Sequence, residues 1–509
     1  MNDNRAHRPK HLRILGAAVV ALTLFASGCS GDGPGKSLFG GREPEYFDAP
    51  VARAADGDII LQPAADETSL SVALSEVRYE SSPGVVVATS GDDPEATDVA
   101  AEFGIPLLVL PAEAAPEQVD VIADEVTRLG AGVVTSVGIE ELPEAIATAA
   151  MPGEGDEGKR LAPAETPSAT WTAIVADDAT AAVVGPYADR DGAEVLVAAE
   201  PRQSGELIAT LAADPGTTVI GIGEGLPDEE SFAWQVRTAR TGVILPGGDN
   251  QSATSNRIYV ALYGHPGTAA LGVLGEQGVE ATIARAAEHA YAYAPYTDLN
   301  LVPTMEIIAT VASASAGADG NYSAESDLEH LRPLINAAGE AGQYVVLDLQ
   351  PGRTDFLTQA KLYEEFLLMP HVGLALDPEW RLKPDQVHLR QIGSVGADEV
   401  NTVITWLADL TRDNDLPQKI LILHSFQVRM LPDVGSVDTS RPELALTVHV
   451  DGQGGQSAKQ DTWRVLHNHA SNIPYWGWKN FYDEDSPAML TPAQTIANVH
   501  PTPLFISYQ

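Results

Sequence analysis

From Arg257 to the C-terminus, short apolar runs alternate with segments of helical periodicity, and this alternation constrains the fold more than any other feature. The predicted strands are 257–264, 301–311, 343–349, 372–377, 419–425, 444–450, 473–478 and 503–508. The predicted helices are 279–293, 325–341, 355–369, 398–412, 457–469 and 491–498. Eight strands with interleaved helices in roughly 250 residues are typical of a (β/α)8 TIM barrel. We therefore predict an α/β chain whose residues 257–509 form such a barrel.

Prolines indicate where the mouth of the predicted barrel lies. The strands run into His265-Pro266-Gly267, Gln350-Pro351-Gly352 and Asp377-Pro378-Glu379. Proline cannot donate to a strand ladder, so in a buried sheet it lies at strand ends. Active sites of such barrels occupy the carboxyl ends of the strands.

Polar and aromatic residues at these strand ends are candidate site residues. They are His265, Glu306, Asp348, Gln350, Asp377, Glu379, His424, His449, Asp451, Trp476, Lys479 and Tyr508. Because residues two apart on a strand share a face, we expect Asp348 to project with Gln350, and Asp377 with Glu379. Ten of the twelve histidines lie between His265 and His500, which supports this location. Carboxylates and aromatic rings around a cavity suit carbohydrate chemistry, in which one acid protonates the leaving oxygen and flat rings stack on sugars.

The segment Leu376-Asp377-Pro378-Glu379-Trp380 resembles the Asp-x-Glu at a strand end of glycoside-hydrolase barrels, and more loosely that of the Chalaropsis-type lysozymes. The resemblance implies Glu379 as general acid and Asp377 or Asp348 as the assisting carboxylate. The other strand-end residues would bind substrate. Structural roles for the two aspartates, as hydrogen-bond acceptors for neighbouring loops, are the alternative.

A metal site is a second alternative at the same place. His424 and His449 could bind a metal with Asp348 or Asp451, as in barrel deacetylases or phosphodiesterases. No HxH or HxxE spacing supports this, so we expect no metal. The glycine run at 221–225 lacks the GxGxxG spacing of a dinucleotide site, so we expect no cofactor.

The single cysteine of the chain, Cys29, follows a basic segment, a short apolar run and Ala26-Ser27-Gly28. Residues 1–28 therefore resemble the signal peptide and lipobox of bacterial lipoproteins. The resemblance implies diacylation of Cys29 and anchoring at the outer face of the cell membrane. Plain secretion is the alternative. Residues 29–68, rich in Gly, Pro, Asp and Ala, are predicted to be a flexible tether.

Two pieces between the tether and the barrel, 69–150 and 168–245, look like copies of each other. The apolar runs 84–89 and 104–110 recur at an offset of 88 residues, as 172–177 and 192–198. Apolar strands alternating with helices predict two tandem Rossmann-like parallel α/β repeats. Ser82-Pro83-Gly84-Val85-Val86-Val87-Ala88-Thr89 and Phe103-Gly104-Ile105-Pro106-Leu107-Leu108-Val109 resemble the cell-wall-binding repeat (type 2) of Gram-positive surface proteins.

The formal charge of −41 excludes nucleic acid as a general partner, because its phosphates would repel the chain. We expect an envelope lipoprotein that associates with the cell wall and binds, and hydrolyses, a wall glycan, either peptidoglycan or a linked polysaccharide. A neutral or amino-bearing glycan fits the acidic charge best. Two alternatives remain open: a non-catalytic scaffold lipoprotein with a degenerate barrel, and a solute-binding receptor lipoprotein.

Overall fold

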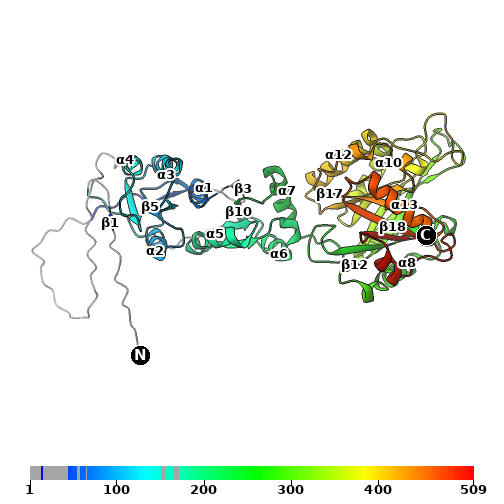
Figure 1. Cartoon of the computed structure of the whole chain (residues 1–509), viewed down its shortest axis with the longest axis horizontal. Helices are drawn as coiled ribbons and strands as arrows, with labels where there is room; N and C mark the ends of the chain where they lie inside the picture. The colour runs from blue at the N-terminus through cyan, green and yellow to red at the C-terminus, as the bar shows by residue number, and fades with distance from the viewer. Residues whose placement is uncertain are drawn as a thin grey trace, which may run out of the picture. The chain divides into compact units, whose positions relative to one another are not determined.

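The computed structural model describes residues 13–14, 44–53, 58–62, 64, 66–150, 156, 158–164 and 171–509. Cys29 and, apart from Arg13–Ile14, the predicted signal segment lie outside the described residues. The chain divides into two compact units (Figure 1). The first comprises residues 1–201 and 214–236, and the second comprises 202–213 and 237–509.

The first sheet of the N-terminal unit is four-stranded, with the order β1-β7-β5-β6. Its strands are β1 (Arg13–Ile14), β5 (Gly84–Ala88), β6 (Leu107–Val109) and β7 (Val133–Val137). β5 pairs in parallel with β6 and β7, and β1 is antiparallel to β7. The helices of this part are α1 (Glu67–Arg78), α2 (Pro94–Phe103), α3 (Pro116–Leu129) and α4 (Glu144–Ala149). A short antiparallel pair, β2 (Val51–Ala52) with β4 (Tyr79–Ser81), lies beside them in sequence.

The second sheet of this unit is entirely parallel, with the order β3-β10-β8-β9. Its strands are β3 (Ile59–Gln62), β8 (Trp171–Val175), β9 (Glu194–Val197) and β10 (Thr218–Ile222). Helices α5 (Asp178–Asp191), α6 (Gly205–Ala213) and α7 (Glu229–Arg240) belong to the same stretch of sequence, and α6 is part of the second unit. One apolar core includes Val86 and Val109 of the first sheet with Ala173 and Ile220 of the second.

The position of β3 corrects the predicted tether. Residues 29–68 were expected to be a flexible tether, yet Ile59–Gln62 form an edge strand parallel to β10, and α1 begins at Glu67. The strand has only four residues, and the Gly, Pro and Ala residues around it are typical of a loop, so the sequence gives no clear strand signal there. It is held by a partner strand about 160 positions further along the chain, which composition alone does not reveal.

A closed barrel of eight parallel strands forms the centre of the second unit, as predicted. Its strands are β11 (Arg257–Gly264), β12 (Asn300–Ala312), β14 (Tyr344–Leu349), β15 (Val372–Leu376), β16 (Lys419–Ser425), β17 (Leu444–Val450), β18 (Tyr475–Asn480) and β19 (Phe505–Tyr508). Neighbours in the chain pair in order, and β11 closes the ring by pairing with both β12 and β19. Each strand begins and ends within two residues of its prediction. A short strand that was not predicted, β13 (Ser323–Glu325), pairs antiparallel with the end of β12.

Helices surround the strands (Figure 1). They are α8 (Val279–Tyr291), α9 (Leu328–Glu340), α10 (Phe356–Leu362), α11 (Glu364–Leu367), α12 (Ala397–Asp413), α13 (Gln456–His469) and α14 (Pro492–Asn498). The predicted helix 355–369 is thus two short helices, α10 and α11, separated by Tyr363. After β16 the chain forms two 3-10 turns, Val428–Met430 and Val434–Ser436, in place of a long helix.

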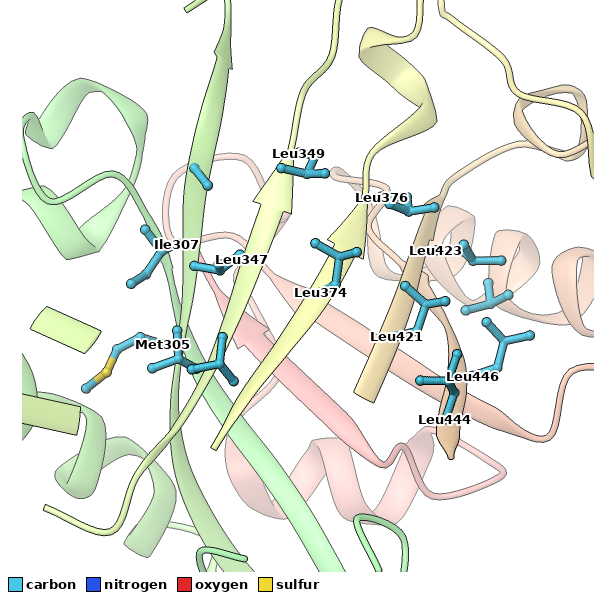
Figure 2. Packing of buried hydrophobic residues seen from close by; sticks show 14 of the residues in the cluster. Met305, Ile307, Leu347, Leu349, Leu374, Leu376, Leu421, Leu423, Leu444 and Leu446 are labelled. Atoms are coloured by element: carbon cyan, nitrogen blue, oxygen red, sulfur yellow. The ribbon is translucent and has the colours of Figure 1, made fainter. Parts of the chain in front are cut away.

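Alternate residues of the strands build two separate apolar layers. One face of β12, β14, β15, β16 and β17 carries the leucines and the neighbouring Met305 and Ile307 that Figure 2 shows, and these pack with helix residues such as Phe356 and Leu407. The alternate residues, among them Tyr259, Val346 and Ile422, form the second layer inside the barrel. This inner layer fills the barrel on the amino-terminal side, so the carboxyl ends of the strands remain to form a site.

Candidate functional site

The eight barrel strands each place one polar residue next after the inner apolar layer, at their carboxyl ends. Strand alternation explains the pattern, since each such residue lies two positions beyond an inward-facing neighbour. For example, Asp348 follows the inner-layer residue Val346, and His424 follows Ile422. The eight residues, which we call the mouth ring, are Tyr263, Glu306, Asp348, Asp377, His424, His449, Lys479 and Ser507. All eight are buried.

His424 on β16 lies at the centre of the mouth ring between two carboxylates. Its Nε2 is 2.8 Å from Oε1 of Glu306 on β12, and its Nδ1 is 3.0 Å from Oδ2 of Asp451, which follows β17. Burial alone would lower the pKa of His424, but Glu306 and Asp451 hold that pKa well above its usual range. Burial would raise the pKa of Asp451, but the hydrogen bond with His424 lowers that pKa below its usual value. His424 therefore lies between two carboxyl groups from other strands, and both favour its protonated form.

Asp348 on β14 lies on the other side of the His424 ring. Its Oδ1 is 3.8 Å from Nε2 of His424, and its Oδ2 accepts a hydrogen bond of 2.8 Å from the hydroxyl of Tyr263. Gln350 donates to the same hydroxyl at 3.3 Å, while its Oε1 accepts from the backbone N–H of Ala312. Burial raises the pKa of Asp348 to about 6. Asp348 and Gln350 are thus joined through Tyr263, as strand alternation predicts.

His449 on β17 adds a second imidazole beside the first. Its Nδ1 lies 3.3 Å from Nδ1 of His424, and its Nε2 lies 3.1 Å from the Oγ of Ser507. Burial and the positive charges of His424 and Lys479 lower the pKa of His449 well below its usual value. The ring lies close against Gly477 of β18, where an added Cβ would come to 2.3 Å from Cδ2 of His449. Gly477 therefore makes room for this imidazole.

Asp377, which belongs to the mouth ring, and Glu379 follow directly after β15. The sequence places them on one strand face, but the strand ends at Leu376, and Pro378–Trp380 form a 3-10 turn. Asp377 caps this turn, and its Oδ1 accepts a hydrogen bond of 3.1 Å from the N–H of Glu379. The chain leaves the sheet here because proline cannot continue the ladder.

The two acids of this turn differ in exposure. Asp377 is buried, and burial together with Asp348 raises its pKa well above the usual range. Glu379 is half-buried, and burial together with the charge of Asp451 raises its pKa to about 7. Glu379 differs from the other acids of the mouth because it combines partial exposure with a pKa near neutrality. The other acids are Glu306, Asp348, Asp377 and Asp451.

Lys479 on β18 is the second cation of the mouth. Its Nζ lies 3.5 Å from the centroid of the Tyr263 ring, a cation–π contact. The backbone around it is held by a buried ion pair: Nζ of Lys459 on α13 lies 2.5 Å from Oδ2 of Asp485 and also donates to the carbonyl of Lys479 at 2.8 Å. Asp485 in turn accepts from the N–H of Phe481.

Three predicted site residues lie away from this cluster. Trp476 and Tyr508 belong to the outer apolar layer, between strands and helices, because the inward residues of β18 and β19 are the alternate ones. Trp476 donates to the carbonyl of Ile473 and stacks on His467, and the hydroxyl of Tyr508 lies 2.6 Å from that of Tyr293.

The third residue is His265. It follows β11, is half-buried, and contacts Ser326 and His330, with its Nε2 3.0 Å from the Oγ of Ser326. None of these contacts of Trp476, Tyr508 and His265 involves an acid of the mouth. The expectation that aromatic rings of Trp476 and Tyr508 face the mouth is therefore wrong, since a residue and its immediate neighbour on a strand cannot both face inward.

Tyr263 and Ser507 belong to the mouth ring but were not among the sequence candidates. Both alternate with inner-layer residues, Tyr263 with Ala261 and Ser507 with Phe505. That alternation was the available signal. Neither residue is charged, so neither is conspicuous within an apolar strand of the sequence.

Three buried carboxylate oxygens in the mouth have no hydrogen-bond partner among the described residues. They are Oε2 of Glu306, Oδ1 of Asp348 and Oδ1 of Asp451. A buried acceptor without a donor costs free energy, on the order of 1–3 kcal/mol and more for a charged group. The mouth therefore favours a ligand that offers hydroxyl or ammonium donors, or a cation. One atom each from Glu306, His424 and His449 lie within 4.8 Å of one another, close enough to share a metal ion.

Comparison with known proteins gives no family for this chain. No family model matches it, and no curated protein matches it. Within the part of the chain that the structure describes, no helix is both long and apolar enough to cross a bilayer.

Proposed function

We propose that the C-terminal barrel binds and hydrolyses a cell-wall glycan, with Glu379 as the general acid and Asp348 or Asp377 as the assisting carboxylate. The observation that carries the proposal is the state of Glu379. This half-buried carboxyl, with a pKa of about 7, lies at the carboxyl ends of the barrel strands. At neutral pH a large fraction of it is protonated, as a donor to a leaving oxygen must be.

The remaining groups of the mouth fit the same chemistry. Asp348 is available as the assisting carboxylate, because its Oδ1 has no hydrogen-bond partner among the described residues. An oxocarbenium-like transition state carries positive charge, and the carboxylate of Asp451, whose pKa is lowered, together with that of Asp348 provides negative charge in the mouth. Tyr263 positions Asp348 through the 2.8 Å hydrogen bond.

The test measures new reducing ends after the purified full chain is incubated with peptidoglycan and with its linked polysaccharide. Glu379→Gln is expected to abolish cleavage while the melting temperature stays within a few degrees of the unaltered chain. Glu340→Gln, at an exposed glutamate on α9, is the matched control and should cleave normally. Unchanged turnover in Glu379→Gln would remove Glu379 from the role of acid. Binding of the glycan without new reducing ends would support the non-catalytic scaffold instead.

We further propose that the chain is a lipoprotein held at the outer face of the cell membrane through Cys29. Its support is the sequence alone: a basic segment, a short apolar run and three small residues before the only cysteine. Cys29→Ala expressed in a bacterial host should lose incorporation of labelled palmitate and should no longer fractionate with membranes. Equal labelling of the two proteins would rule out this anchor.

The two sheets of the N-terminal unit are proposed to be tandem Rossmann-like repeats that hold the barrel against the wall. What supports this is a shared strand order, because the first strand of each, β5 or β8, lies between the other two. Sedimentation of the full chain with purified wall sacculi tests the association. Loss of sedimentation when the sacculi are stripped of linked polysaccharide would identify the polymer, and no sedimentation with either form would contradict the proposal.

A further inference from the structure

Glu306, His424 and His449 come from three different strands, β12, β16 and β17, and converge on one point of the mouth. Each offers one ligand atom, and these atoms all lie within 4.8 Å of one another. We propose that these three residues bind a divalent transition-metal ion, of which Zn²⁺ is the representative. Two imidazoles with one carboxylate are a common protein ligand set for zinc and for other first-row metals.

The hydrogen bond behind His424 suits this role. Asp451 contacts Nδ1 of His424 at 3.0 Å, which leaves Nε2 directed at Glu306. Metal-binding histidines commonly donate their other N–H to a carboxylate, which fixes the ring and makes the ligating nitrogen more basic. With an ion on Nε2, the proton on Nδ1 remains as the donor to Asp451. Gly477 serves the second imidazole similarly, because only a residue without a side chain leaves space for the His449 ring.

Independent support comes from the unpaired oxygens next to these ligands. Oε2 of Glu306 is buried and has no partner among the described residues, and the same is true of Oδ1 of Asp348, 3.8 Å from Nε2 of His424. A divalent ion between them would satisfy both oxygens and balance the excess of acids over cations. Asp348 is therefore placed to join the three ligands.

The burial of the ligands distinguishes an ion from an organic cation. Glu306, Asp348, His424 and His449 are each 0% exposed. A bare ion, with bonds near 2.1 Å, needs only the space between ligand atoms that lie within 4.8 Å of one another. An ammonium group carried on a sugar would have to displace the surrounding side chains. Imidazole ligands also favour a transition metal over Ca²⁺ or Mg²⁺, which take oxygen.

This inference goes beyond the proposed function, because the general acid Glu379 is not among the ligands, and an ion that engages Asp348 leaves Asp377 as the assisting carboxylate. The two proposals can fail separately. A chain that binds the ion without cleaving any glycan would contradict the proposed function alone. A chain that cleaves glycan equally well with and without chelator, and binds no ion, would contradict this inference alone.

The experiment titrates the purified full chain, first stripped with a chelator, with Zn²⁺ in a calorimeter, and counts bound zinc after dialysis by elemental analysis. We expect one ion per chain. His449→Ala and Glu306→Gln should each weaken binding on the order of 100-fold. His500→Ala, at an exposed histidine outside the mouth, is the matched control and should bind as the unaltered chain does. Glu379→Gln should also keep its ion.

A second measurement covers variants that fail to fold. Co²⁺ added to the unaltered stripped chain should produce visible absorption bands of a nitrogen- and oxygen-ligated site, and Zn²⁺ should abolish them. Zinc should also raise the melting temperature of the unaltered chain, since a ligand of the native state stabilises it. The absence of cobalt bands together with no bound zinc would overturn the inference. Equal zinc affinity in folded His449→Ala and Glu306→Gln would overturn it as well.

Discussion

Nε2 of His424 lies 2.8 Å from Oε1 of Glu306, although 118 positions separate the two residues in the chain. The contact exists because β12 and β16 both end at the mouth of a closed barrel. It links the two roles that we propose for the mouth, since the acids that surround His424 also set the protonation of Glu379 above them.

The alkaline limb of glycan cleavage is expected to follow Glu379. Its pKa is raised to about 7, so the acid form is present below that pH and is lost as the pH rises through it. The groups whose charges act on Glu379 are Asp451, Lys479, His424, Asp348 and Asp377. Lys479→Met removes a cation that lowers this pKa, so the limb of kcat/KM should move to higher pH. Arg429→Met, at an exposed arginine outside the mouth, should leave the limb in place; a limb that stays fixed in Lys479→Met would speak against Glu379.

Breaking the ion pair between Lys459 and Asp485 should destabilise the barrel strongly. Both side chains are buried, and Asp485→Asn leaves the Lys459 ammonium buried without its counter-charge. Removing one member of such a pair typically costs about 3 to 5 kcal/mol. Urea unfolding should therefore show a lower midpoint for Asp485→Asn than for Asp483→Asn, at an exposed aspartate nearby. Equal midpoints would mean that water reaches the pair.

Lys419, at the start of β16, should make stability depend on pH in the alkaline range. It is fully buried and donates to the carbonyls of Met369 and Val372, and burial lowers its pKa to about 7 from 10.5. Between those values the unfolded chain holds a proton that the folded chain does not. This contribution to the free energy of unfolding therefore rises as the pH rises from about 7 to about 10, by at most about 1.4 kcal/mol per pH unit.

Lys419→Met removes the titrating group and tests this sign. The free energy of unfolding of the unaltered chain, minus that of Lys419→Met, should increase from pH 7 to pH 9 in urea titrations. Lys361→Met, at an exposed lysine on α10, should give a difference that does not change with pH. A flat difference for Lys419→Met would show that Lys419 is charged in the folded chain.

Replacing Trp476 should affect stability and not glycan binding. Its ring packs in the outer layer against Trp463 and His467. Trp476→Ala is expected to lower the free energy of unfolding by about 3 to 5 kcal/mol, as large aromatic deletions in cores do. Calorimetry at a temperature where the variant is folded should give an unchanged Kd for glycan. Tyr296→Ala, at an exposed ring, should change neither quantity. A weakened Kd with unchanged stability would place Trp476 at the site after all.

The strands of the barrel were predictable from sequence to within two residues because their signals are local, whereas the predicted helix 325–341 begins only at Leu328 and the predicted helix 355–369 is divided in two. The runs 257–264, 419–425 and 444–450 agree with β11, β16 and β17 at both ends. An apolar run flanked by turn residues needs no knowledge of its partner to be identified. β3 was missed for the opposite reason, since its four residues are a strand only because β10 pairs with them.

The face of each strand was less predictable than its bounds. Trp476, Lys479 and Tyr508 were all expected at the mouth, but only Lys479 is inward. In a parallel barrel both faces of a strand are buried, so hydrophobicity does not distinguish inside from outside. The sequence contains no local metal motif because the three proposed ligands lie on three different strands, β12, β16 and β17, and are therefore far apart in the chain.

The sequence by itself determined the alternation of strands and helices, the (β/α)8 class and the end of the barrel where the acids gather, because each depends on residues near one another in the chain. Only the tertiary structure decided which side chains meet. Closure of the barrel brings Glu306 to His424 and sets His449 against Gly477, and the resulting burial shifts the pKa of Glu379 to about 7. Burial and charge depend on all eight strands together, and a single stretch of sequence contains neither.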